Sequence, residues 1–229
     1  MKTMSLYTKL LSLSIIGLTV SHSHSAITWG AAQDIGTETG DVITTGILHA
    51  AVNAAVDDAA DITLNGVLFE SGDINAATNV STTGFTSSNA ANLNPQILPL
   101  GDTTNYQNFL GDVDFGGGTD SGDITIENLI DGQQYIIQAW FVDDRNGLNG
   151  FRETTLSSVG GNEVELNDQF AVGTFTADGT TQIFNVATAG AAGPNFTGFQ
   201  VRAVPEPSST ALLGLGGFSL LLMRRRSAR

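Results

Sequence analysis

Few side chains in the central part of this chain could act as a base or a nucleophile. Residues 26–203 contain one histidine, His49, and neither cysteine nor lysine. A Ser-His-Asp or Cys-His system would rest on His49 alone, and the histidines of a three-histidine zinc site are missing. His49 lies in an alanine-rich stretch, which favours a role in packing or at the surface. Two carboxylates flanking a cleft would still suffice to hydrolyse a glycosidic bond. We predict a non-catalytic protein, with a carboxylate-dependent glycosidase as an alternative.

The densest group of carboxylates surrounds a run of three glycines at residues 116–118. Calcium takes about six to eight oxygen ligands, so clustered aspartates are a natural site for it. The spacing differs from that of a helix-loop-helix calcium loop, because no glutamate stands at the twelfth position. These residues, and a second group at positions 57, 58 and 61, also fit acidic turns in solvent. The candidate calcium ligands are Asp112, Asp114, Asp120 and Asp123.

A further group of polar residues follows the most apolar predicted strand, residues 133–142. Arginine beside carboxylates at a strand end can donate forked hydrogen bonds to sugar hydroxyls, while a nearby aromatic ring stacks on the sugar. Trp140 or Phe151 would supply that ring. An Arg-Asp pair that fixes the loop within the domain is the alternative. The candidate ligand-binding residues are Trp140, Asp143, Asp144, Arg145 and Arg152.

The charge of residues 26–203 limits the possible partners. Three arginines stand against twenty-two acidic residues, so the formal charge is 3 − 22 = −19. Such a charge repels nucleic acid and anionic membrane surfaces and leaves cations, neutral polymers or basic surfaces as partners. A solvated acidic surface that keeps the protein soluble is the alternative. We predict no nucleic-acid partner.

The elements that would position these residues are mostly short strands. Asn65-Gly66, between residues 62–64 and 67–69, is a signal for a type I′ hairpin turn, and Asp178-Gly179, between residues 170–176 and 182–186, is a second hairpin signal. Residues 124–126 and 196–201 also read as strands, and Asp131-Gly132 as a turn. Residues 47–60 are alanine-rich and predict a helix of two or three turns. Trp29 is expected to anchor the core.

Residues 133–142 carry apolar side chains on both faces. This predicts a central strand that is covered on both sides, or one whose second face carries an aromatic platform. Many short strands without alternating helices predict an all-β fold, a β-sandwich or jelly roll.

Both ends of the chain have the composition of targeting signals. Lys2 and Lys9 precede an apolar run at residues 10–20 and small residues up to Ala26, the pattern of a secretory signal peptide cleaved near Ser25. The run is too short for a membrane span, which needs about 20 apolar residues. At the other end, Pro205, Glu206 and Pro207 precede an apolar run at residues 211–223 and the basic group Arg224, Arg225 and Arg226.

This C-terminal order resembles the PEP-CTERM sorting signal, which implies processing by a membrane protease of the exosortase class. A tail anchor or a buried helix is the alternative, but thirteen residues span only about 20 Å of a hydrocarbon core about 30 Å thick. We expect a hydrophobic sorting helix that holds the chain in the inner membrane transiently. The predicted organisation is a signal peptide at residues 1–25, a β-sandwich domain at 26–203 and the sorting signal at 204–229.

A second resemblance rests on residues 131–145, 173–178 and 199–202. These segments resemble exported PEP-CTERM proteins of planctomycete and verrucomicrobial type, and their layout is similar to carbohydrate-binding jelly rolls of the galactose-binding and malectin-like kind. The signal peptide and the sorting signal predict export through the Sec pathway to the cell envelope or the extracellular polysaccharide, and the second resemblance implies that the protein associates with polysaccharide there. A structural or adhesive matrix protein without a discrete ligand site is the alternative.

Overall fold

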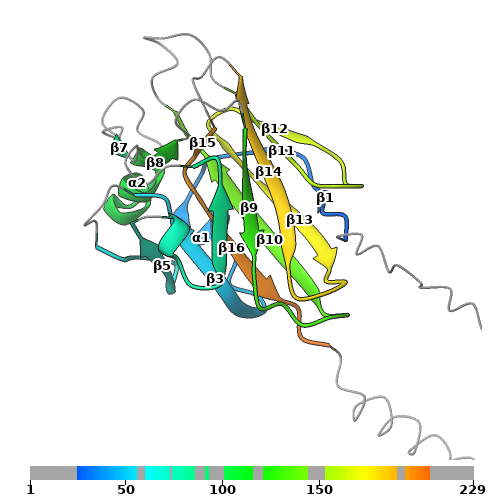
Figure 1. Cartoon of the computed structure of the whole chain (residues 1–229). Coiled ribbons are helices and arrows are strands. Elements are labelled where there is room, and N and C mark those ends of the chain that lie inside the picture. Colours follow the sequence, from blue (N-terminus) through cyan, green and yellow to red (C-terminus); the bar gives the residue numbers. More distant parts are fainter. Residues whose placement is uncertain are drawn as a thin grey trace, which may run out of the picture.

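Two β-sheets pack face to face as a sandwich in the computed structural model (Figure 1). The structure describes residues 25–55, 60–72, 74–85, 91–92, 101–115, 121–143, 153–189 and 194–206. Both predicted targeting segments, apart from residues 204–206 and Ser25, lie outside these ranges.

The larger sheet has eight strands, and all its pairings are antiparallel except the one between β3 and β5. Its order is β1 (Thr28–Trp29), β13 (Gln169–Thr176), β10 (Gln134–Phe141), β16 (Gly198–Ala203), β3 (Ile47–Asn53), β5 (Val67–Ser71) and β4 (Ile62–Leu64), with β2 (Gln33–Asp34) beside β13.

The second sheet has five strands in the order β12 (Val164–Leu166), β11 (Glu153–Ser157), β14 (Gln182–Ala189), β9 (Ser121–Ile126) and β6 (Val80–Thr83). A smaller sheet at one end contains β15 (Asn195–Phe196), β8 (Asp112–Phe115) and β7 (Ala91–Asn92). The helical elements are α1 (Glu38–Asp41), α2 (Thr104–Gly111) and the short 3-10 helix η1 (Ile74–Ala76). In α2, the Thr103 hydroxyl caps the first turn by accepting from the Tyr106 N–H at 3.1 Å.

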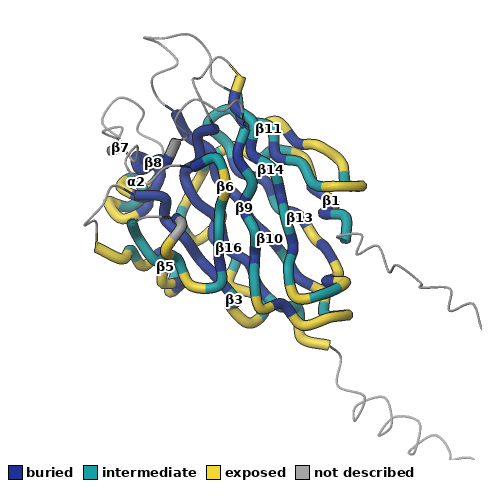
Figure 2. Tube along the Cα trace, viewed as in Figure 1, coloured by how far each residue is buried: buried dark blue, intermediate teal, exposed yellow. Residues whose placement is uncertain are grey.

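The prediction that the strand near residues 133–142 is central and covered on both sides is confirmed. Strand β10 lies between β13 and β16 and is almost wholly buried (Figure 2). Tyr135 and Ile137 belong to the core between the two large sheets, whereas Trp140 belongs to a second core on the outer face of the larger sheet. Helix α2 covers that second core, and the β4–β5 hairpin at the edge of the same sheet completes it. The larger sheet is therefore the middle layer of the molecule, between the five-stranded sheet and helix α2.

The first predicted hairpin is also confirmed. Strands β4 and β5 pair antiparallel, and Asn65 and Gly66 turn the chain with φ of 45° and 77°. Positive φ at both central positions is what a type I′ turn requires, and Asn-Gly tolerates it at low cost. Trp29 is 3% exposed and lies in the core between the sheets, as expected.

Two local predictions were wrong. Residues 47–53 form strand β3 instead of a helix, because small side chains fit between two cores: Ala50 and Val52 face the inner core and Ala51 the outer one. Packing on both faces outweighs the helix propensity of alanine. The chain does bend at Asp178-Gly179, but β13 and β14 belong to different sheets, so this connection crosses the sandwich and is not a hairpin.

Candidate functional site

The C-terminal strand ends where the predicted sorting signal begins. Ala203 pairs with Ile47 on one side and Tyr135 on the other. One residue further on, the Val204 N–H donates to the Gln134 carbonyl at 2.8 Å. Pro205 and Glu206 are exposed, and the chain leaves the sandwich at the lower end in Figure 1. The folded domain thus holds the backbone up to the first proline of the signal.

A buried arginine fixes the loop that covers this last strand. The Arg202 side chain is 8% exposed, and its guanidinium donates to the carbonyls of Thr44, Thr45 and Gly46 at 2.9–3.0 Å. Desolvation by burial lowers the pKa of Arg202. Gln200 extends the clamp by donating to the Ile43 carbonyl at 3.0 Å. Sequence reasoning missed this role, since nothing local indicates that an arginine will bind distant carbonyls.

Trp140 does not offer a face to a ligand, which corrects one predicted site residue. Its side chain is fully buried, with Phe69 and Phe109 packed edge-on against it at centroid distances of 5.9 and 5.3 Å. Its Nε1–H donates to the Tyr106 hydroxyl at 3.1 Å, and that hydroxyl donates to Asp41 Oδ2 at 2.8 Å. The physical reason is that α2 covers the outer face of β10, where an open platform was considered.

The hydroxyl of Tyr106 is the neutral middle member of this buried hydrogen-bond network. Burial raises the pKa of Tyr106 well above its ordinary value, and the hydrogen bond to Asp41 raises it further. Asp41 is itself held by the Gly36 N–H, which donates to Oδ2 at 2.7 Å. This hydrogen-bond network therefore ties α1 and α2 to the central strand.

Asp143 lies at the end of β10 and is also fully buried. Its Oδ2 accepts from Asn195 Nδ2 at 3.0 Å, and its N–H donates to Asp168 Oδ1 at 3.0 Å. These contacts make Asp143 a support for the chain after the strand instead of a ligand-facing group. The other predicted members of this binding site, Asp144, Arg145 and Arg152, lie outside the described residues.

The candidate calcium ligands separate into two places. Asp112 and Asp114 are buried on β8, where Asp112 Oδ2 accepts from Asn53 Nδ2 at 2.9 Å. Asp123 lies on β9 of the five-stranded sheet and accepts from Asn185 Nδ2 at 2.7 Å. Asp120 lies outside the described residues. Within the described part of the chain, no group of three or more His, Cys, Asp or Glu residues is placed to hold a metal ion. Calcium binding stays a prediction.

His49 has a packing role in the structure. Its Nε2 lies 2.8 Å from the Glu127 carbonyl oxygen, and its ring meets Tyr135 edge-on at a centroid distance of 5.7 Å.

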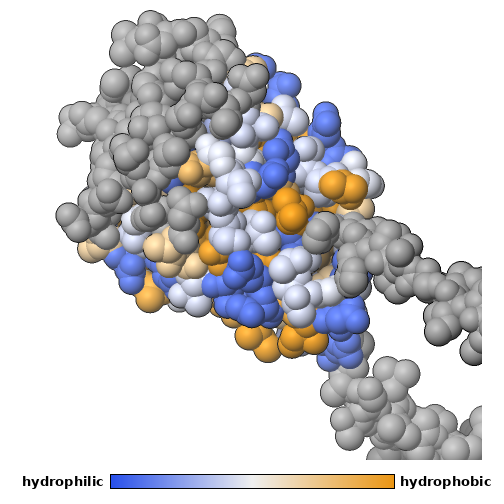
Figure 3. All heavy atoms as spheres, in the orientation of Figure 1, coloured by the Kyte–Doolittle hydropathy of each residue, from blue (hydrophilic) through white to orange (hydrophobic). Residues whose placement is uncertain are grey.

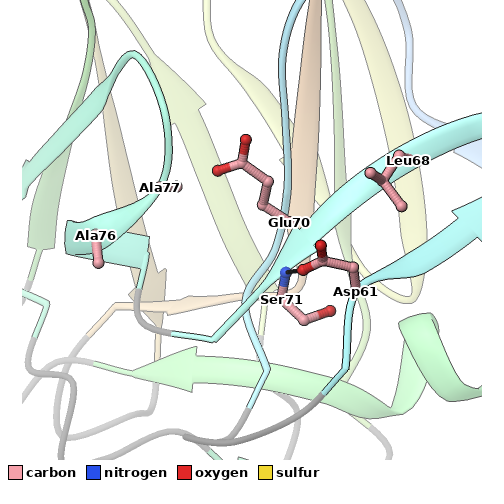
Figure 4. Close-up of a pocket in the computed structure, with 6 residues that line it drawn as sticks. All are labelled: Asp61, Leu68, Glu70, Ser71, Ala76 and Ala77. Atoms are coloured by element: carbon pink, nitrogen blue, oxygen red, sulfur yellow. Dashed lines mark hydrogen bonds between the residues drawn. The ribbon is translucent and has the colours of Figure 1, made fainter.

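A pocket of about 330 Å³ lies beside β5, where η1 and the residue that follows it approach the strand (Figure 4). It combines two carboxylates and a hydroxyl with small apolar side chains; its lining consists of Asp61, Leu68, Glu70, Ser71, Ala76 and Ala77. Asp61 Oδ1 accepts from the Ser71 N–H at 3.0 Å. Glu70 Oε2 accepts from the Thr78 N–H at 2.7 Å. Sequence reasoning assigned Asp61 only to an acidic group and did not identify the pocket.

Comparison with known families identifies the C-terminal segment. Residues 203–226 match the model of the PEP-CTERM protein-sorting motif. The chain therefore carries the sorting motif of an exosortase substrate, which implies an exported protein destined for the cell surface or for secretion. No curated protein and no solved structure matches the chain. In the described ranges, no helix is long and apolar enough to cross a membrane.

Proposed function

We propose that this protein is exported through the Sec pathway, is processed by exosortase, and then acts in the envelope or extracellular matrix as a non-catalytic protein that associates with polysaccharide. One observation carries the proposal: the sorting motif matches from Ala203, the last residue of a buried central strand. The motif is therefore joined directly to a rigid β-sandwich, and that domain is what sorting delivers.

The pocket beside β5 supports a role in binding sugars. Asp61 and Glu70 supply carboxylate oxygens, which accept hydrogen bonds from hydroxyl groups. Leu68 is 51% exposed, and together with two alanines it provides an apolar wall for the C–H face of a sugar ring. Ligand sites typically combine a few polar groups with apolar walls in this way.

The charge of the domain favours one class of polysaccharide. A formal charge of −19 over residues 26–203 opposes the approach of a polyanion. Neutral polysaccharides, or those with free amino groups, avoid this repulsion, and an amine would also gain from the two carboxylates of the pocket. We therefore infer a neutral or amine-bearing polymer as the partner.

The environment of the candidate chemical groups supports a non-catalytic role. The His49 ring packs against Tyr135, and its Nε2 lies at hydrogen-bond distance from the Glu127 carbonyl oxygen. Each of the two pocket carboxylates accepts a hydrogen bond from a backbone N–H. Incubation with polysaccharide, followed by a reducing-end assay, tests this part. Release of sugar that is lost in Asp61→Asn or Glu70→Gln would replace the proposal by a glycosidase.

A co-sedimentation experiment tests polysaccharide association. The secreted protein is mixed with a neutral, an amine-bearing and an anionic polysaccharide, each with calcium and with chelator. We expect saturable binding to the first two polymers, weakened at least about tenfold in Glu70→Gln, because a hydrogen bond to a charged group contributes about 1.5–3 kcal/mol. Glu165→Gln, which removes an exposed carboxylate on β12, is the matched control and should bind normally. Binding to none of the neutral or amine-bearing polymers would overturn the proposal.

A further inference from the structure

The folded domain is tied very closely to the segment that follows it. The backbone is paired up to Ala203, and Val204 is held by both the Gln134 carbonyl and the Gln133 side chain, whose Nε2 donates to the Val204 carbonyl at 2.6 Å. The apolar run of the sorting signal begins at Ala211. The seven residue-to-residue steps from Val204 to Ala211, at about 3.3–3.6 Å each, reach at most about 25 Å. Before cleavage, this end of the sandwich cannot move further than that from a bilayer that holds the apolar run.

The same end of the sandwich carries exposed apolar side chains. Ile47 is 67% exposed and pairs through its backbone with Ala203, while Leu48, next to it, is 39% exposed. Ile130 is 66% exposed, and its carbonyl accepts from the Gln133 N–H at 3.1 Å. Three of the five exposed large apolar side chains in the described ranges thus lie around the exit of the chain. Figure 3 shows apolar spheres at this lower edge. We call Ile47, Leu48 and Ile130 the exit patch.

We propose that the exit patch docks on the surface of the lipid bilayer while the protein is still attached by its C-terminal segment. The short segment between Val204 and Ala211 and the position of the exit patch both favour one orientation of the domain. In this orientation the lower end of the sandwich faces the membrane. Asp131 and Asp178 are exposed at this end, so anionic headgroups are disfavoured and zwitterionic lipid is the surface that fits. Exposed aliphatic side chains partition into the interfacial region of such a bilayer. This inference goes beyond the proposed role in binding polysaccharide and does not depend on it.

The absence of cysteine from the chain allows a direct test. The full chain, with its C-terminal segment intact, is reconstituted into phosphatidylcholine vesicles whose acyl chains are brominated near the headgroup. A fluorophore is attached to Thr45→Cys, which is exposed at the exit end, or to Ala189→Cys, which is exposed at the far end of β14. The seven steps along β14 separate the two ends of the sandwich by about 23 Å. We expect quenching at position 45 to be at least about twice that at position 189, since quenching by bromine requires close approach.

A second comparison separates docking from simple proximity. The double substitution Ile47→Ser and Ile130→Ser should reduce quenching at position 45 to the level at position 189, while Leu68→Ser, an apolar-to-polar change on β5, should leave it unchanged. Unfolding curves confirm that the variants are folded. Equal quenching at both labelled positions, or quenching at position 45 that survives the double substitution, would overturn the proposal. Quenching at position 45 that appears only after exosortase is added, or only at protein concentrations high enough for two copies to associate, would assign the patch to a protein partner and would also overturn the proposal.

Discussion

Replacing Tyr106 with phenylalanine removes one oxygen from the buried hydrogen-bond network that joins α1, α2 and β10. The hydroxyl donates to Asp41 Oδ2 at 2.8 Å and accepts from Trp140 Nε1 at 3.1 Å. A hydrogen bond to a charged group contributes about 1.5–3 kcal/mol, and a buried N–H left without an acceptor costs about 1–3 kcal/mol. The Asp41 carboxylate keeps the hydrogen bond from the Gly36 N–H, so it loses only part of its hydrogen bonding in the variant. We expect Tyr106→Phe to lower the free energy of unfolding by about 3–5 kcal/mol.

Tyr135→Phe is the matched control. The Tyr135 hydroxyl accepts one hydrogen bond, from the Ile130 N–H at 3.0 Å, at a partly exposed turn where water can replace it. Its loss should cost about 0.5–1.5 kcal/mol. Urea unfolding of the secreted protein, followed by the fluorescence of Trp29 and Trp140, measures both values. Similar losses in the two variants, within about 0.5 kcal/mol, would refute the reasoning that the outer core depends on this buried hydrogen-bond network.

Three further predictions concern the same framework. The folded protein keeps the proton on Tyr106 above pH 10, where the unfolded chain, with a tyrosine pKa of about 10, releases it. The free energy of unfolding should therefore fall above pH 10 by up to about 1.4 kcal/mol per pH unit. Urea titrations at alkaline pH measure this slope, and Tyr106→Phe should remove it. Gly198→Ala would place its Cβ 2.5 Å from the Val52 carbonyl oxygen and should cost about 1–3 kcal/mol, whereas Gly179→Ala, with open space around it, should change stability by less than about 0.5 kcal/mol. A chain that ends at Glu206 should melt like the full domain, because the described contacts end at Val204, whereas one that ends before β16 should show no cooperative transition by circular dichroism.

Local signals in the sequence predicted the elements whose structure is decided locally. Asn65-Gly66 requires little beyond its own backbone preference to turn the β4–β5 hairpin. The apolar alternation of β10 is long enough to indicate a strand buried on both faces. The order of prolines, apolar run and arginines in the tail was likewise sufficient to identify the sorting motif.

Long-range packing decided the features that the sequence did not reveal. An alanine-rich segment fits a helix or a tightly covered strand, and only the two cores on either side of β3 select the strand. Trp140 follows the same logic, because a buried anchor and a ligand platform require the same residue type. Its partner Tyr106 lies thirty-four residues earlier, on a helix that covers this face.

The candidate pocket was hidden for a related reason. Asp61 and Glu70 line the same pocket because the β4–β5 register pairs Ile62 with Phe69 and so places the residues just outside that pair on neighbouring strand ends. Two alanines from the segment after β5 complete the wall. The buried pairing of Asp112 with Asn53, on a strand fifty-nine residues earlier, could not be read from the spacing of aspartates alone.

The last strand of the domain connects folding with sorting. Strand β16 lies between β10 and β3, and its Phe199 and Val201 side chains are fully buried in the core between the sheets. The larger sheet is therefore incomplete until almost the entire domain has been exported, because its middle strand comes last. The sorting motif starts at the end of that strand, so its first proline, Pro205, is presented at a fixed place only once the sheet has closed. A cut beyond Val204 leaves the core intact, whereas a cut within β16 would remove the centre of the sheet.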